Sequence, residues 1–102
     1  MKANPLERKF PELQKIPRVK LVQSPTPVEK LENLSEEFEK VDLWVKRDDL
    51  TNPDYGGNKP RKFEYMLADA LEQGKKNVIT IGGVGSNHAL ANSVFCKKFD
   101  LN

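Results

Sequence analysis

The sequence predicts an α/β protein whose helices cover a parallel sheet in three layers. Two observations predict this class. All seven prolines lie at or before Pro60 and all six glycines lie at or after Gly56, so the chain changes character near residues 53–60. After that point, a helical pattern, a β-branched segment, a glycine turn and a second helical pattern follow one another with short links. This order is typical of a parallel α/β sheet.

The N-terminal half is expected to hold one helix and one strand. Residues 1–25 contain four prolines and show little periodicity, which indicates an irregular arm. Thr26 as N-cap, Pro27 at the first helical position and Glu29 as the partner in a capping box predict a helix from about residue 27 to 40. Apolar and polar residues then alternate over residues 41–47, which predicts a strand.

The C-terminal half is expected to form a helix, a strand and a second helix. After Pro60, the following apolar residues recur at helical spacing: Phe63, Met66, Leu67, Ala70 and Leu71. Gly74 stands where such a helix would end, and NVITI (residues 77–81) is predicted to be a short strand. The second helix is expected to be capped by Ser86 or Asn87 and to bury the following residues: Leu90, Ala91, Val94 and Phe95. Because so few strands cannot cover a parallel sheet, we expect the chain to be the N-terminal part of a longer protein.

Composition argues against several classes of partner. The 17 basic and 15 acidic side chains nearly cancel, and the lysine pairs form no stripe, so no nucleic acid is expected. No apolar run has the length of a membrane span and the N-terminus lacks a signal-peptide core, so we expect a cytoplasmic protein without a membrane partner. One cysteine and one histidine predict neither a disulfide framework nor a metal site.

The segment GGVGSNH (residues 82–88) is expected to be a turn between a strand and a helix. Backbone N–H groups and the positive end of the helix dipole would converge there, which suits an anion. The spacing does not match a dinucleotide fingerprint, because His88 occupies the third small position. Plain helix capping by Ser86 and Asn87 explains the same residues without any ligand.

The segment GGNKPRK (residues 56–62) places three cations within four residues at the start of a predicted helix. The helix dipole favours acidic residues at that position, so the cations work against it. The segment is therefore either a solvated basic turn or a site for an anion such as phosphate. A lysine held among other cations can also lose its proton more readily and become a nucleophile.

Taken together, the two segments resemble the N-terminal part of a family of pyridoxal-phosphate enzymes. The family includes D-cysteine desulfhydrase and 1-aminocyclopropane-1-carboxylate deaminase, and it has the tryptophan-synthase-β-like fold, called fold type II. The resemblance covers roughly residues 43–102. It is carried by the Gly-Asn-Lys-x-Arg-Lys motif that ends at Lys62 and by Ser-Asn-His from Ser86 to His88.

The resemblance implies which residues of the two motifs hold the cofactor. Lys59 would carry pyridoxal 5′-phosphate as a Schiff base, Asn58 would also bind the cofactor, and Lys62 would approach the cofactor phosphate. Asn87 would contact the hydroxyl of the pyridine ring. Freed from the cofactor, the Lys59 amine would remove the proton from Cα of the substrate.

The resemblance also implies the substrate and the assembly. Ser86, Asn87 and His88 would lie against a small amino acid, with Ser86 also catalytic and His88 receiving the carboxylate. Histidine at this position is usual in the desulfhydrases, so α,β-elimination from D-cysteine or a related D-amino acid ranks first and deamination of 1-aminocyclopropane-1-carboxylate second. Gly85 differs from the glutamine common in the family. The full-length protein is expected to be a homodimer.

The resemblance divides the chain into two parts. Residues 1–55 would be an arm, helix and strand of the large cofactor domain, and residues 56–102 would begin the small α/β domain. Most of the family's other cofactor contacts lie downstream of this segment. A truncated, non-catalytic module that binds anions or another protein is therefore the alternative from a different class.

Overall fold

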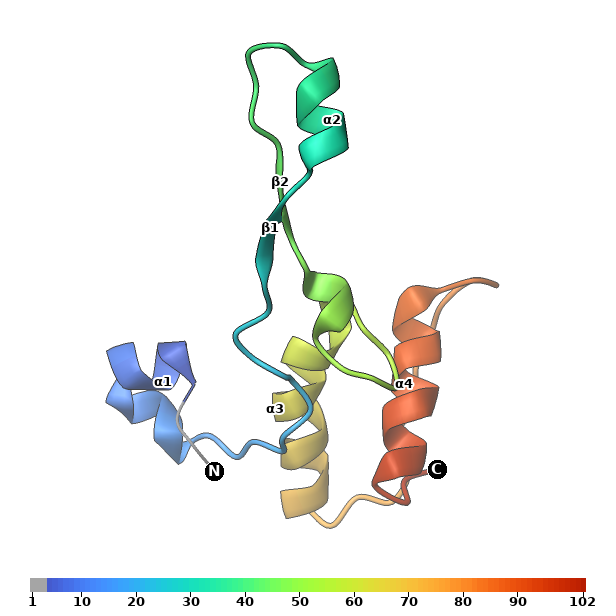
Figure 1. Ribbon diagram of the computed structural model, residues 1–102. Coiled ribbons are helices and arrows are strands. Elements are labelled where there is room, and N and C mark those ends of the chain that lie inside the picture. The colour runs from blue at the N-terminus through green and yellow to red at the C-terminus, as the bar shows by residue number, and fades with distance from the viewer. Residues whose placement is uncertain (1–3) are drawn as a thin grey trace.

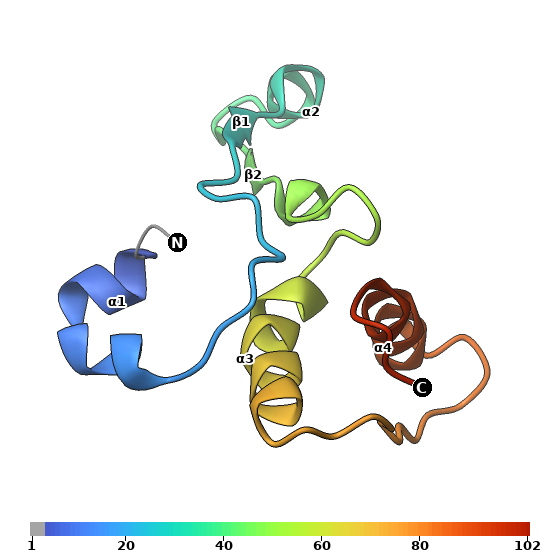
Figure 2. The same ribbon diagram turned by 90° about the horizontal axis from the view of Figure 1, so that it is seen from below.

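The computed structural model describes residues 4–102 and shows an N-terminal half that branches away from a pair of helices (Figure 1). The elements in chain order are α1 (Pro5–Lys9), the 3₁₀ helix η1 (Pro11–Lys15), β1 (Val28–Lys30), α2 (Glu32–Glu37), β2 (Trp44–Lys46), the 3₁₀ helix η2 (Asp48–Leu50), α3 (Lys59–Glu72) and α4 (Asn87–Lys98). Helices α3 and α4 pack side by side with their N-termini at the same end, as the colours in Figure 1 and the view in Figure 2 show.

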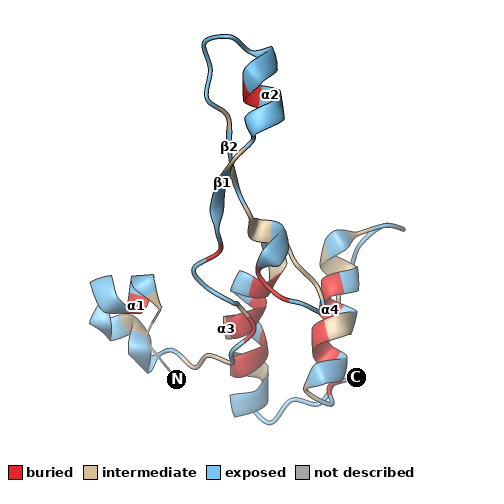
Figure 3. Cartoon of the chain, viewed as in Figure 1, coloured by how far each residue is buried: buried red, intermediate tan, exposed pale blue. Residues whose placement is uncertain are grey.

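The hydrophobic core lies between α3 and α4 (Figure 3). The rings of Phe63 and Phe95 meet there with centroids 5.8 Å apart, and both side chains are fully buried. Leu67 of α3 and Ala91 of α4 belong to the same buried cluster. The predicted helical faces are therefore confirmed at these positions. Among the other predicted members, Met66, Leu71 and Leu90 are exposed.

The N-terminal arm is more regular than expected, because α1 and η1 form within residues 5–15. A complete capping box starts α1: the Asn4 side chain accepts from the Glu7 N–H at 2.9 Å, and Glu7 accepts from the Asn4 N–H at 2.8 Å. Arg18 then joins the arm to α3, with ion pairs to Glu7 at 2.8 Å and to Glu64 at 3.2 Å. The apolar periodicity of the sequence does not predict α1 and η1; the capping box and the buried ion pairs of Arg18 stabilise this part of the arm.

The predicted helix over residues 27–40 is wrong in its first part. Residues Val28–Lys30 form β1, which pairs antiparallel with β2 so that Val28 faces Lys46. Thr26 does not cap a helix; its hydroxyl donates to Asp48 at 3.3 Å. Cross-strand hydrogen bonds satisfy the backbone here, and the helix is confined to α2. The strand predicted over residues 41–47 is confirmed in its second half, as β2.

The segment NVITI is not a strand among the described residues, and the sheet they form is antiparallel. Ile79 and Ile81 are 91% and 94% exposed, because no neighbouring strand covers them in residues 4–102. One parallel pairing is nevertheless present: Asn102 donates to the Lys76 carbonyl at 2.8 Å and accepts from the Val78 N–H at 2.7 Å. The chain after α4 therefore returns alongside the segment predicted to be a strand.

Candidate functional site

The structure brings the two motif segments together at the N-termini of α3 and α4. The Tyr55 hydroxyl donates to the Asn87 amide oxygen at 3.2 Å. Eight residues further along the chain, the Phe63 ring stacks on the His88 ring with centroids 5.2 Å apart and planes 12° from parallel. Lys59 lies between Tyr55 and Phe63, one helical turn before Phe63 on the same face of α3. It is therefore placed where the two helices begin.

The turn before α3 is specified by the two glycines of the first motif. A Cβ on Gly56 would lie 1.9 Å from the Asp49 carbonyl oxygen, so no side chain fits there. Gly57 has φ +91°, which side chains disfavour, and its N–H donates to the Asp48 carbonyl at 2.7 Å. The buried Thr51 hydroxyl donates to the Gly57 carbonyl at 2.6 Å. These contacts fix the direction in which the chain enters α3.

The lysine side chains of the first motif are available to a ligand. Lys59 is half-buried, and its amine donates to the Asn58 amide oxygen at 3.1 Å in a solvent-exposed hydrogen bond. Asn58 is the N-cap residue of α3 but makes no capping hydrogen bond with its side chain. Lys62 is exposed, with its amine 5.9 Å from the centroid of the Phe63 ring. Two lysines in the first turn of α3 add positive charge at the N-terminus of this helix, which suits an anion.

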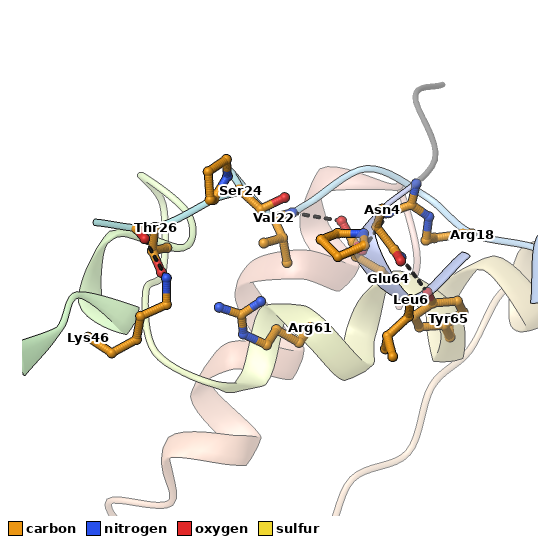
Figure 4. A pocket seen from close by; sticks show the side chains of 12 residues that line it. Asn4, Leu6, Arg18, Val22, Ser24, Thr26, Lys46, Arg61, Glu64 and Tyr65 are labelled. Atoms are coloured by element: carbon orange, nitrogen blue, oxygen red, sulfur yellow. Dashed lines mark hydrogen bonds and ion pairs between the residues drawn. The ribbon is translucent and has the colours of Figure 1, made fainter. Parts of the chain in front are cut away.

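Arg61 serves a different part of the molecule. Its position two residues after Lys59 turns it about 200° around the helix, and it forms an ion pair with Asp48 at 2.8 Å. The Arg61 guanidinium, through this hydrogen bond, lowers the pKa of Asp48 below its ordinary value of 3.8. Figure 4 shows Arg61 beside a cavity of about 310 Å³ between the arm, β2 and α3. Arg61 thus holds the turn and does not face the junction with α4.

The start of α4 combines capping with free polar groups. Ser86 is the N-cap, and its oxygen accepts from the Ala89 N–H at 3.3 Å, which confirms the capping interpretation for this residue. Gly85 has φ +84° and lets the turn enter the helix. Within residues 4–102, the Asn87 amide nitrogen has no hydrogen-bond partner, and the Nδ1 atom of His88 is buried without one. The exposed Asn87 side chain is open to a ligand, whereas the Nδ1 atom of His88 is enclosed by the protein.

Sequence reasoning missed Tyr55, which joins the two segments. No spacing rule connects a tyrosine in a turn to an asparagine 32 residues later. The position of Tyr55 immediately before the glycine pair was the available indication. No cluster of three metal-binding side chains occurs within residues 4–102, and no helix in that range has the length and hydrophobicity to cross a bilayer.

Comparisons with known proteins place residues 19–102 within the family model described as "Pyridoxal-phosphate dependent enzyme". A Pyrococcus horikoshii protein named "Putative 1-aminocyclopropane-1-carboxylate deaminase" is 48% identical over 93 residues, which are 91% of this chain and 28% of that protein. D-cysteine desulfhydrase of Serratia proteamaculans is 42% identical over 90 residues, covering 88% of this chain and 27% of the desulfhydrase.

The fold of the chain also matches a solved structure. The crystal structure titled as that of "the ACC deaminase homologue" superposes with a TM-score of 0.83 at 46% sequence identity. The match covers 98% of this chain and 30% of the other. The chain thus spans less than a third of the length of the relatives that it matches, and it carries the α/β arrangement of their N-terminal part.

Proposed function

The chain belongs to the family of pyridoxal-phosphate-dependent enzymes, and we propose that it supplies the lysine wall of such an enzyme's active site. In this proposal Lys59 holds the cofactor covalently, and the protein acts on a small amino acid. The observation that carries the proposal is the position of Lys59 at the start of α3, between Tyr55 and Phe63, whose side chains contact Asn87 and His88 at the start of α4. The division of the chain between a large and a small domain remains a prediction.

The residues at the junction fit the chemistry of this cofactor. An aldehyde needs a primary amine, and the half-buried Lys59 offers one whose neighbour is the Asn58 amide oxygen. A phosphate needs cations or helix N-termini, and Lys62 stands in the first turn of α3. A ring hydroxyl needs a donor, and the Asn87 amide nitrogen has no partner among the described residues. The donor set therefore matches a flat aldehyde that carries a phosphate.

When bound, the cofactor supplies an electron sink for the pair left at Cα of the amino acid. Lys59 accepts the Cα proton on its free amine and can return it later. Ser86 and Asn87, at the positive end of the α4 dipole, bind the substrate side of the site. His88 is held flat against Phe63 and donates toward the substrate carboxylate.

We rank the elimination of sulfide from D-cysteine first among substrates. That reaction breaks the Cβ–S bond and, after water adds, releases pyruvate, ammonia and sulfide. His88 supports this order, because the desulfhydrases of the family usually have histidine at this position. Ring opening of 1-aminocyclopropane-1-carboxylate ranks second and is favoured by the greater identity to the Pyrococcus horikoshii protein. Release of pyruvate from one substrate or of a four-carbon keto acid from the other distinguishes them.

The attachment of the cofactor is tested by absorption spectroscopy of the complete gene product. We expect the wild type to gain a visible band when pyridoxal 5′-phosphate is added, and Lys59→Ala to lose it. Lys75→Ala is the matched control, because Lys75 is exposed beyond the end of α3. A band that persists unchanged in Lys59→Ala would contradict the assignment. Equal binding of plain phosphate without any band would favour the non-catalytic module.

A further inference from the structure

Both the ring and the backbone of Tyr55, whose hydroxyl contacts Asn87, are held by other residues. Its ring packs edge-on against the buried Phe95, with centroids 6.5 Å apart and planes at 85°. Its backbone N–H donates at 3.2 Å to the side chain of Asn52, which is 6% exposed and donates in turn to the Leu21 carbonyl at 2.7 Å. The Tyr55 hydroxyl is therefore a donor whose position is set by the core and by the turn.

The hydrogen bond from Tyr55 engages the oxygen end of the Asn87 amide. The hydroxyl donates to Oδ1 at 3.2 Å, and a side-chain amide presents its oxygen and its nitrogen in opposite directions. With Oδ1 turned to Tyr55, the amide N–H₂ group is directed elsewhere. It has no hydrogen-bond partner within residues 4–102. The exposed Asn87 side chain would otherwise be free to rotate and to present either atom to a ligand.

We propose that Tyr55 is a positioning residue that orients Asn87 as a hydrogen-bond donor toward the ring hydroxyl of the cofactor. This inference rests on the proposed function, in which Asn87 is the residue that meets that hydroxyl. Tyr55 also belongs to the turn that leads into Lys59, so one side chain couples the lysine segment to the start of α4. An ion pair between Asp54 and Lys98, at 2.7 Å, joins the same turn to the other end of α4.

The proposal predicts a spectroscopic effect. A donor on the ring oxygen stabilises negative charge there, which favours loss of the proton from the nitrogen that joins lysine and cofactor. If Tyr55→Phe leaves Asn87 free to rotate, part of that stabilisation is lost. The pH midpoint of the visible band should then rise by about half a unit. The substitution leaves the other charged and titratable side chains at the junction, Lys62 and His88, in the sequence.

The experiment compares two tyrosine variants in the complete gene product. Tyr55→Phe removes the hydroxyl that contacts Asn87. Tyr65→Phe removes a hydroxyl that accepts from the Asn4 amide at 2.9 Å, next to the cavity beside the arm, and serves as the matched control. We expect the higher pH midpoint, and an affinity for pyridoxal 5′-phosphate about threefold weaker, in Tyr55→Phe alone. In the cofactor-free protein, NMR should show shifted Asn87 side-chain amide resonances in the same variant.

Each outcome either supports the inference or overturns it. A raised midpoint with shifted Asn87 resonances in Tyr55→Phe, and neither change in Tyr65→Phe, supports it. Equal midpoints and unchanged Asn87 resonances in both variants overturn it while leaving the proposed function intact. A wild type that forms no visible band at all overturns the proposed function together with this inference. Loss of the band in Tyr55→Phe with normal Asn87 resonances also contradicts it, because positioning requires the amide to move.

Discussion

Replacing Glu64 by alanine should destabilise the junction between the N-terminal arm and α3. The carboxylate is buried and accepts from the N–H groups of Leu21 at 2.9 Å and Val22 at 2.8 Å, and it pairs with Arg18 at 3.2 Å. Removing one partner of a buried ion pair costs about 3–5 kcal/mol, because the remaining charge and donors stay desolvated. Arg18 keeps its second ion pair, with Glu7 at 2.8 Å, so the expected cost lies near the lower end of that range.

Denaturant unfolding of the complete gene product measures this loss of free energy. Glu72→Ala is the matched control, since Glu72 is an exposed glutamate of the same helix and should change stability by no more than about 0.5 kcal/mol. Hydrogen exchange adds a local measurement, because the amides of Leu21 and Val22 should lose protection in Glu64→Ala. A loss below about 1 kcal/mol with unchanged exchange at both amides would refute the account of this buried network.

Three further predictions concern the turn and the core. Gly56→Ala should lower both stability and cofactor binding, because its Cβ would lie 1.9 Å from the Asp49 carbonyl oxygen, and unfolding and binding titrations measure the two losses. The ion pair with Arg61 lowers the pKa of Asp48 below 3.8. The small stabilisation that this pair gives the folded protein should therefore be complete above pH 3.8 and be lost as the pH falls further. Unfolding of the wild type and of Asp48→Asn at a series of pH values measures it. Burial raises the pKa of the Cys96 thiol, so alkylation by iodoacetamide should be slow in the native protein and fast after denaturation.

Each of these predictions has a control or an opposing result. Gly83→Ala should be tolerated, because a Cβ there meets no atom of residues 4–102 within 4 Å; equal losses in the two glycine variants would contradict the steric account. An Asp48→Asn effect that grows as the solution becomes more acidic would have the wrong sign for a carboxylate with a lowered pKa. Equal alkylation rates of Cys96 in native and denatured protein would show that the thiol is not buried.

Local sequence patterns predicted the structure correctly where the interactions lie within a single helix and its caps. The apolar spacing of Phe63 and Leu67 predicted α3, and Gly74, with φ +67°, lies just beyond its end. Ser86 was predicted as a possible cap of α4 and forms that cap. In these cases the interactions lie within a few residues of one another, so the sequence contains all the information that they need.

Local sequence patterns gave wrong or incomplete predictions where contacts between residues far apart in the chain determine the structure. The capping signature from Thr26 to Glu29 is overridden by pairing of β1 with β2, which lies about 16 residues away in the chain. The β-branched segment 77–81 needs neighbouring strands, and the described residues provide only its first parallel contact, at Asn102. The Tyr55–Asn87 bond connects a turn to a helix and follows no period. Tertiary contacts of this kind cannot be read from local propensity.

Chemical mapping of the cofactor-bearing residue tests the central claim most directly. The complete gene product is loaded with pyridoxal 5′-phosphate, the lysine–cofactor bond is reduced with borohydride, and the digested peptides are sequenced by mass spectrometry. The placement of Lys59 at the junction of α3 and α4 predicts that the modification lies on Lys59, without a matching signal on Lys62. Modification of Lys62 or of any other lysine in its place, or of none, would contradict the account.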